Sequence, residues 1–116
     1  MIRTKRAYDP PHDDDGARFL VDRLWPRGVS REALRIQDWL KDAAPSNELR
    51  KWYGHDASRW DEFSRRYRAE LQERPEALAP LLDAARVGDV TLVYAKKDTE
   101  RNNAVVLAEV LRERLG

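Results

Sequence analysis

Three short segments of the chain have the hydrophobic pattern of β-strands. Residues 2–8 alternate with period two, which predicts an edge strand with one wet face. Residues 18–22 are apolar at three consecutive positions, Phe19 to Val21, and residues 89–95 form a continuous apolar run with β-branched residues. Such runs are typical of strands covered on both faces, as in a parallel sheet.

Five further segments have helical patterns. Ser30 and Ser46 are suited to cap two short helices, the second ending at Gly54. Longer apolar stripes predict helices over residues 58–73 and 75–87. A last helix is predicted behind Thr99 as its N-cap and extends to Leu115. Residues 9–16 read as an exposed loop, and residues 36–46 fit a helix or a strand equally well.

Buried strands interleaved with helices predict an α/β fold. At 116 residues the chain has the length of one domain, spanning residues 1–116. We therefore expect a single three-layer domain with a small, mostly parallel sheet flanked by helices.

Composition narrows the function classes. The 22 basic and 21 acidic side chains nearly cancel, which argues against a protein that binds nucleic acid simply by being basic. Without cysteine there is no disulfide or thiolate site, and the two histidines lack the spacing of a metal site or a catalytic triad. No apolar run is long enough for a signal peptide or a membrane span. We expect a soluble cytoplasmic protein with no membrane partner and no metal site, and the sequence identifies no cofactor.

Two charged segments follow the two buried strands. They are "DRLWPRG", residues 22–28, and "KKDTERNN", residues 96–103. Ligands of open α/β sheets bind beyond the carboxyl ends of the strands. If the two strands are neighbours, one cleft collects six charged side chains: Asp22, Arg23, Arg27, Lys96, Lys97 and Asp98.

Asp22 and Asp98 are the candidate catalytic carboxylates. Strand alternation puts Arg23 and Trp25 on one face and Asp22 on the other, apolar face, where a carboxylate needs a partner. Asp22 therefore either accepts structural hydrogen bonds or acts as an acid or base. Asp98, beside Lys97, is either the second such group or half of a solvated ion pair.

The candidate ligand-binding residues are mostly basic. Arg23 and Arg27 flank a stiff proline, and Gly28 lets the chain turn, so two guanidinium groups can face a phosphate or carboxylate. Their alternative is pairing with the chain's own acids. The remaining ligand-binding candidates are Trp25, Ser46, Arg50, Lys97 and Asn102. Each of them also has a structural alternative, in the core, in a helix cap or on a solvent-exposed face.

Four blocks of the sequence resemble the YeaO-like family of bacterial domains of unknown function. They are "DRLWPRGVSRE", "WLKDAAPSNELRKWYGH", "RWDEFSRRYRAEL" and "VTLVYAKKDTERNNAVVLAEVL". The resemblance covers nearly the whole chain from Tyr8 onward but implies no established activity. Members commonly carry histidine at the position of Asn103, which puts a general base there in doubt. Some relatives carry the label of a transcription regulator, but this sequence shows no helix-turn-helix with a basic recognition helix.

Three hypotheses follow from these patterns. The leading one is an α/β domain that holds an anionic small molecule, such as a nucleotide or sugar phosphate, at Arg23, Arg27 and Lys97, with a hydrolase or transferase step left open. The second is a nucleic-acid-binding accessory or regulatory protein that adds Lys41, Arg50 and Lys51, with Trp25 or Trp52 stacking on bases. It is the less favoured. The third is an internal ion-pair network, with function in a protein-interaction surface.

Overall fold

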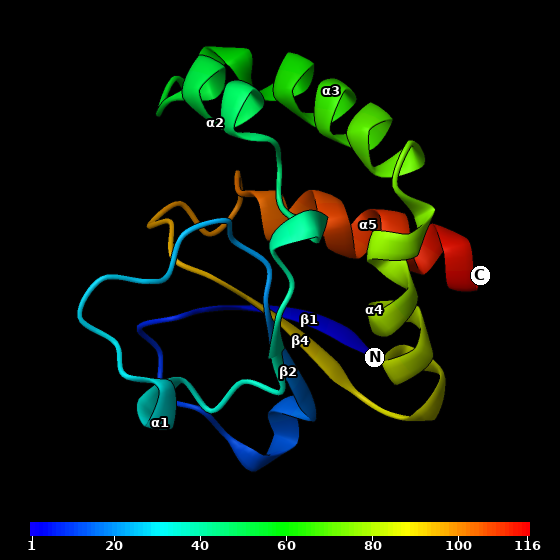
Figure 1. Cartoon of the computed structure of the whole chain (residues 1–116). Helices are drawn as coiled ribbons and strands as arrows, with labels where there is room; N and C mark the ends of the chain where they lie inside the picture. Colours follow the sequence, from blue (N-terminus) through cyan, green and yellow to red (C-terminus); the bar gives the residue numbers. More distant parts are fainter.

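A four-stranded parallel sheet forms the centre of the fold (Figure 1). The computed structural model describes residues 1–116. The strands are β1 (Ile2–Arg6), β2 (Ala17–Leu20), β3 (Asp38–Trp39) and β4 (Val90–Tyr94), in the spatial order β1-β4-β2-β3. All three pairings are parallel, and β1 is an edge strand, as predicted. The two apolar strands β2 and β4 are neighbours in the middle, which meets the condition for a shared cleft at their carboxyl ends.

Five α-helices pack around the sheet. They are α1 (Arg31–Leu34), α2 (Asn47–Tyr53), α3 (Trp60–Gln72), α4 (Pro75–Val87) and α5 (Asn103–Leu115). Ser30 and Ser46 cap α1 and α2 through hydrogen bonds to the backbone three residues on, as predicted. The prediction that Thr99 caps the last helix is wrong, because the Asn102 side chain accepts from the Val105 N–H instead. None of these helices is long and apolar enough to span a membrane.

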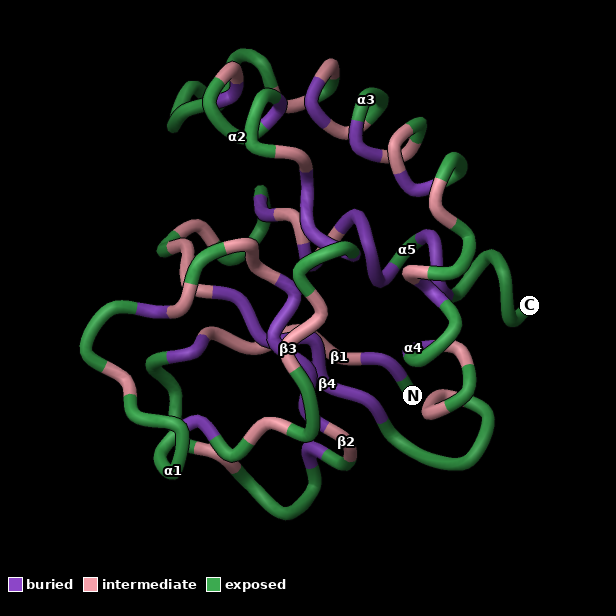
Figure 2. Tube along the Cα trace, in the orientation of Figure 1, coloured by how far each residue is buried: buried purple, intermediate pink, exposed green.

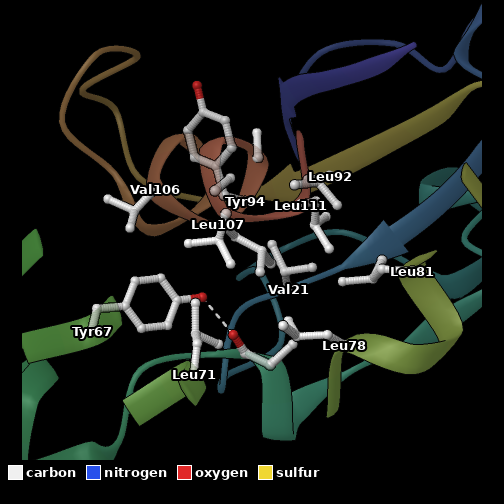
Figure 3. Packing of buried hydrophobic residues seen from close by; sticks show 14 of the residues in the cluster. Val21, Tyr67, Leu71, Leu78, Leu81, Leu92, Tyr94, Val106, Leu107 and Leu111 are labelled. Atoms are coloured by element: carbon white, nitrogen blue, oxygen red, sulfur yellow. Dashed lines mark hydrogen bonds between the residues drawn. The ribbon is translucent and has the colours of Figure 1, made fainter. Parts of the chain in front are cut away.

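The larger core lies between the sheet and helices α2 to α5, which all stack on one face (Figures 1 and 2). Phe19 and Val21 from β2 and its end meet Leu92 and Tyr94 from β4 on this face. Tyr67 of α3 is fully buried there, and its hydroxyl donates to the backbone carbonyl of Ala43 (Figure 3). The α/β prediction is therefore confirmed, with the thickest packing on the α3 to α5 side.

The other face of the sheet carries a thinner layer of loop and short helix. Leu20, Val93 and Leu34 of α1 form a small cluster there, with Trp25 and Trp39 packed against it. The predicted alternation fails after Val21, because β2 ends at Leu20 and Trp25 packs with Leu20 rather than with Phe19. The two tryptophan rings meet edge to face, 5.4 Å apart.

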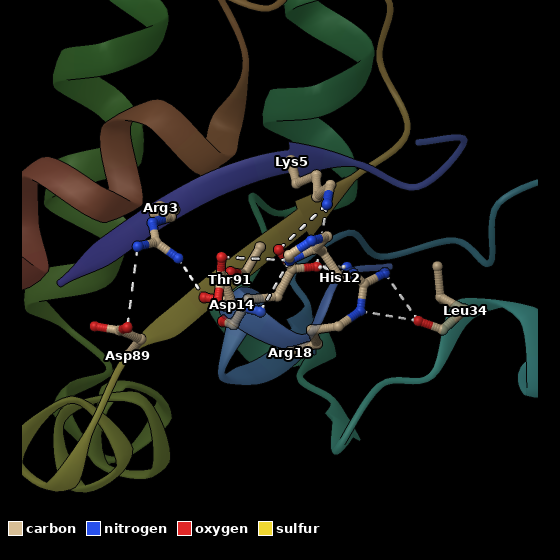
Figure 4. A network of polar contacts seen from close by, with 9 residues as sticks. Arg3, Lys5, His12, Asp14, Arg18, Leu34, Asp89 and Thr91 are labelled. Atoms are coloured by element: carbon tan, nitrogen blue, oxygen red, sulfur yellow. Dashed lines mark hydrogen bonds and ion pairs between the residues drawn. The ribbon is translucent and has the colours of Figure 1, made fainter. Parts of the chain in front are cut away.

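The acidic loop before β2, which was predicted to be exposed, forms a 3₁₀ turn over Asp13–Asp15 and joins a network of polar contacts (Figure 4). Asp15 is buried and accepts from Arg18 at 2.7 Å and from Lys5 at 3.2 Å, while its own carbonyl accepts from Thr91. Arg18 also donates to the carbonyl of Leu34. A buried carboxylate is tolerated only when it is paired, and the partners of Asp15 come from three different strands. The loop therefore links β1, β2 and β4 on the thin side of the sheet.

Candidate functional site

A cavity opens at the carboxyl ends of β2 and β4, where the sequence predicts the site. Its volume is about 640 Å³, within the range of about 300 to 1,000 Å³ that is usual for small-molecule sites. The chain leaves β2 toward α1 on the thin face and leaves β4 toward α5 on the opposite face. Two neighbouring strands whose connections diverge in this way leave a crevice between them. Helix α2 and the start of α3 form the wall of the cavity opposite the strand ends.

Asp22 is the one carboxylate that lines the cavity. The backbone N–H of Ala95, just beyond β4, donates to it at 2.8 Å, and its own carbonyl accepts from the Trp39 indole at 2.7 Å. Burial raises the pKa of Asp22 more than the hydrogen bonds from Ala95 and Asn103 lower it. Its hydrogen-bond partners are neutral donors and it forms no ion pair, although the charge of Arg50 also acts to lower its pKa.

The loop from Asp22 to Gly28 brings two arginines to the cavity. Arg23 donates through Nε to the carbonyl of Pro45 at 3.0 Å, which fixes its stem and leaves its terminal nitrogens without partners in the chain. Arg27 is exposed and pairs with no carboxylate. Gly28 lies outside the lining, and its φ of +78° is a conformation that favours glycine, so it makes the turn.

Helix α2 contributes a second group of cations. Arg50 and Lys51, near its end, line the cavity together with His55. Ser46 does not line it; its hydroxyl and N–H donate to the Glu70 carboxylate at 2.6 and 2.9 Å while the hydroxyl oxygen caps α2. Ser46 therefore anchors α2 to α3 and has the cap role that the sequence already offered as its alternative.

The segment after β4 places Lys96, rather than Lys97, in the cavity. The Lys96 ammonium lies 4.2 Å from the centre of the Tyr53 ring of α2, and burial lowers its pKa. Lys97 is exposed and lies outside the lining. Asp98 is outside as well; it accepts from the N–H groups of Glu100 and Arg101, which lower its pKa and leave it poorly suited to carry a proton.

The start of α5 supplies two amides to the cavity wall. Asn102, the predicted one, is buried and is occupied as the N-cap, and its Nδ2 donates to the Asp98 carbonyl. Asn103, which was not among the predicted site residues, donates to the Val21 carbonyl at 2.8 Å and hydrogen-bonds with Asp22. Asn103 is thus the closer neighbour of the candidate carboxylate.

The cavity is positively charged, and its charges are not neutralised by the protein. Five Lys and Arg side chains line it, and none of them forms an ion pair: Arg23, Arg27, Arg50, Lys51 and Lys96. The hypothesis that Asp22, Asp98 and the two arginines Arg23 and Arg27 form an internal ion-pair network is therefore wrong. Asp98 pairs only with Arg101, at 3.4 Å.

The tryptophans proposed to stack on bases are already covered by the chain. Arg59 and Arg66 lie over the Trp52 ring, 5.2 and 4.3 Å from its centre, and Trp52 does not line the cavity. Trp25 lines it, but its ring meets Trp39 and Arg31, and its N–H donates to Val29.

The structure brings together six of the ten predicted site residues: Asp22, Arg23, Trp25, Arg27, Arg50 and Asn102. Gly28, Ser46, Lys97 and Asp98 lie outside the cavity lining. The sequence analysis missed Tyr53, His55 and Trp60, which α2, the loop after it and the start of α3 bring in. Lys96, which the sequence placed in the cleft but not among the ligand-binding candidates, lines the cavity as well.

Similarity to known proteins extends over nearly the whole chain. The family model described as "Inactive DUF488-N3 subclade" matches residues 1–116. The uncharacterized protein Rv3073c of Mycobacterium tuberculosis (strain H37Rv) is 44% identical over 113 residues, 97% of this chain and 95% of its own length. The uncharacterized protein YeaO of Escherichia coli (strain K12) is 42% identical over 111 residues, 96% of each chain. No solved structure matches.

Proposed function

Because this chain belongs to the DUF488 family, in the subclade described as inactive, we propose that it is a binding domain for a phosphate-bearing small molecule rather than an enzyme. The observation that carries the proposal is the group of five unpaired cations around one cavity, Arg23, Arg27, Arg50, Lys51 and Lys96. Guanidinium groups bind phosphate with two parallel hydrogen bonds, and lysine adds a point charge.

The arrangement of Arg23 suits it to anion binding. Its Nε is already used by Pro45, so the side chain is oriented before a ligand arrives and less rotamer entropy is lost on binding. The remaining donors of the guanidinium face a cavity that holds a single carboxylate. Arg27 and Arg50 are exposed, which places them at the rim, where they can steer an anion inward.

The residues around the cavity favour binding over catalysis. A hydrolase or transferase step needs a nucleophile or an acid and base pair within hydrogen-bond reach of the substrate. Asp22 is the one carboxylate present. Its pKa is raised, and it accepts hydrogen bonds from neutral groups of the chain. The other predicted carboxylate, Asp98, is outside the cavity. This agrees with the name of the subclade.

The test is a thermal-shift panel at constant ionic strength, with inorganic phosphate, pyrophosphate, a sugar phosphate, nucleotides and a short oligonucleotide. A ligand at about 100 times its dissociation constant adds about 2.7 kcal/mol to the free energy of unfolding. We expect stabilisation by phosphate-bearing small molecules and its loss in the double variant Arg23→Ala/Arg27→Ala.

The matched control is the double variant Arg86→Ala/Arg114→Ala, which removes two exposed arginines outside the cavity lining. It keeps the net charge equal to that of the first variant and should retain the stabilisation. No shift with any small molecule would overturn the proposal. So would equal responses of the two double variants, or stabilisation by the oligonucleotide alone, which would indicate a nucleic-acid-binding protein.

A further inference from the structure

Tyr53 has a polar atom that the fold does not use. The residue lines the cavity and is only 5% exposed, and no side chain or backbone group hydrogen-bonds with its hydroxyl. Tyrosine hydroxyls that are buried usually find a partner. The structure contains no fully enclosed side-chain N or O atom without a partner, so this hydroxyl retains some accessible surface on a residue that lines the cavity. It is therefore available to a molecule inside the cavity.

An aromatic wall faces the same space as the cations. Trp60 lines the cavity, is half-buried, and stacks on Phe63 with ring centres 5.6 Å apart and planes 20° apart. Tyr53 packs against both rings, at 6.1 and 4.7 Å. Trp60 is thus fixed from behind and retains accessible surface at the cavity. A bare phosphate or a small sugar phosphate has no flat apolar face to cover it.

Asp22 offers a second acceptor at the inner end of the cavity. A carboxylate can accept about four hydrogen bonds, and Asp22 receives them from Ala95 and Asn103 only. Capacity is left for an N–H or O–H of a ligand. The cavity therefore combines three kinds of partner: cations at the rim, an aromatic wall, and polar groups with free capacity, the Tyr53 hydroxyl and the Asp22 carboxylate.

We infer that the ligand is a nucleotide. This inference rests on the proposed function and adds the class of molecule: the phosphate binds the arginines, the base packs on Trp60, and a polar group of the ligand hydrogen-bonds with the Tyr53 hydroxyl. A nucleotide carries the three features in one molecule, an anion, a flat ring and polar edges. Stacking of a base on an aromatic side chain raises affinity by roughly tenfold to a hundredfold.

The experiment is a calorimetric titration with four probes at constant ionic strength: a purine nucleoside 5′-monophosphate, a pyrimidine nucleoside 5′-monophosphate, ribose 5-phosphate and inorganic phosphate. We expect at least one nucleotide to bind about tenfold or more tightly than ribose 5-phosphate. Equal affinities for nucleotides and ribose 5-phosphate would overturn the nucleotide inference and leave phosphate binding intact. Absence of binding by all four would overturn the proposed function itself.

Two variants assign the contacts. Trp60→Leu should weaken nucleotide binding about tenfold and leave ribose 5-phosphate unaffected. Its matched control is Trp52→Leu, because Trp52 is also half-buried and packs against the same core but does not line the cavity. Tyr53→Phe removes one oxygen atom and keeps the ring packing, so it tests the hydroxyl even where Trp60→Leu fails to fold. Equal nucleotide affinity in Tyr53→Phe and the natural protein would overturn the role of the hydroxyl.

Discussion

Glu70 is expected to hold the helical wall of the cavity in place. Its carboxylate, on α3, accepts from the hydroxyl and the N–H of Ser46 at 2.6 and 2.9 Å. Ser46 begins α2, which carries Arg50, Lys51 and Tyr53 to the cavity. Glu70→Ala removes two hydrogen bonds to a charged acceptor, each worth about 1.5 to 3 kcal/mol when fully buried. Because the pair is only partly buried, we expect a total loss of about 2 kcal/mol in the free energy of unfolding.

Urea denaturation followed by tryptophan fluorescence measures this loss. The control is Glu73→Ala, since Glu73 is exposed at the end of α3 and its side chain makes no hydrogen bond. The control should change the free energy of unfolding by less than about 0.5 kcal/mol. Ser46→Ala should cost about 1 kcal/mol for the lost helix cap and more for the lost bond to Glu70.

A double-mutant cycle decides whether the two residues act through each other. Ser46→Ala/Glu70→Ala should cost less than the sum of the single variants, with a coupling energy of about 0.5 to 3 kcal/mol. Additive effects, or a Glu70→Ala variant as stable as Glu73→Ala, would refute this account of how α2 is anchored. The same variant should weaken anion binding, because the cations of α2 lose their fixed position.

Three further outcomes are expected. Burial raises the pKa of Asp22, so the folded protein keeps this proton to a higher pH than the unfolded chain. As pH rises from the unfolded pKa of about 4 through the folded value, the natural protein should therefore lose stability relative to Asp22→Asn. A stability difference that stays constant across pH would contradict the raised pKa. Tyr67→Phe leaves the buried Ala43 carbonyl unpaired and should cost about 1 to 3 kcal/mol by urea denaturation; a cost near zero would contradict that contact. Gly16→Ala should lower the melting temperature, because the added Cβ would sit 2.2 Å from the Asp89 carbonyl at a φ of +66°, whereas Gly88→Ala, with open space around it, should not.

Local chemistry made much of the fold predictable. Ser30 and Ser46 cap their helices as the sequence indicates, because an N-cap hydroxyl satisfies a backbone N–H within three residues. Apolar runs at β2 and β4 identify the two central strands, since only strands covered on both faces tolerate such runs. The cap of α5 was misassigned to Thr99 because Asp98, Thr99, Asn102 and Asn103 are all acceptable caps, and packing against the sheet selects Asn102.

The candidate site was predictable in position and less so in membership. Neighbouring parallel strands bring their carboxyl ends together, so Asp22 and the loop after it could be paired with the segment after β4. The alternation that assigns faces stops where β2 stops, so the predicted orientation of Trp25 was wrong. Tyr53 and Trp60 join the cavity only through the packing of α2 on α3, which no local pattern encodes.

The sequence by itself determined the class of fold, the place of three of the four strands and of most helices, and the concentration of charge after β2 and β4. These follow from periodicity, capping and the geometry of parallel strands, which act over a few residues. The tertiary structure decided which charges stay unpaired. Lys5 and Arg18 meet the buried Asp15, and Arg68 meets Glu109 and Glu113, whereas the cavity cations meet no acid of their own chain. Ion pairing depends on distances of a few ångströms between segments remote in sequence, and only the packed fold sets those distances.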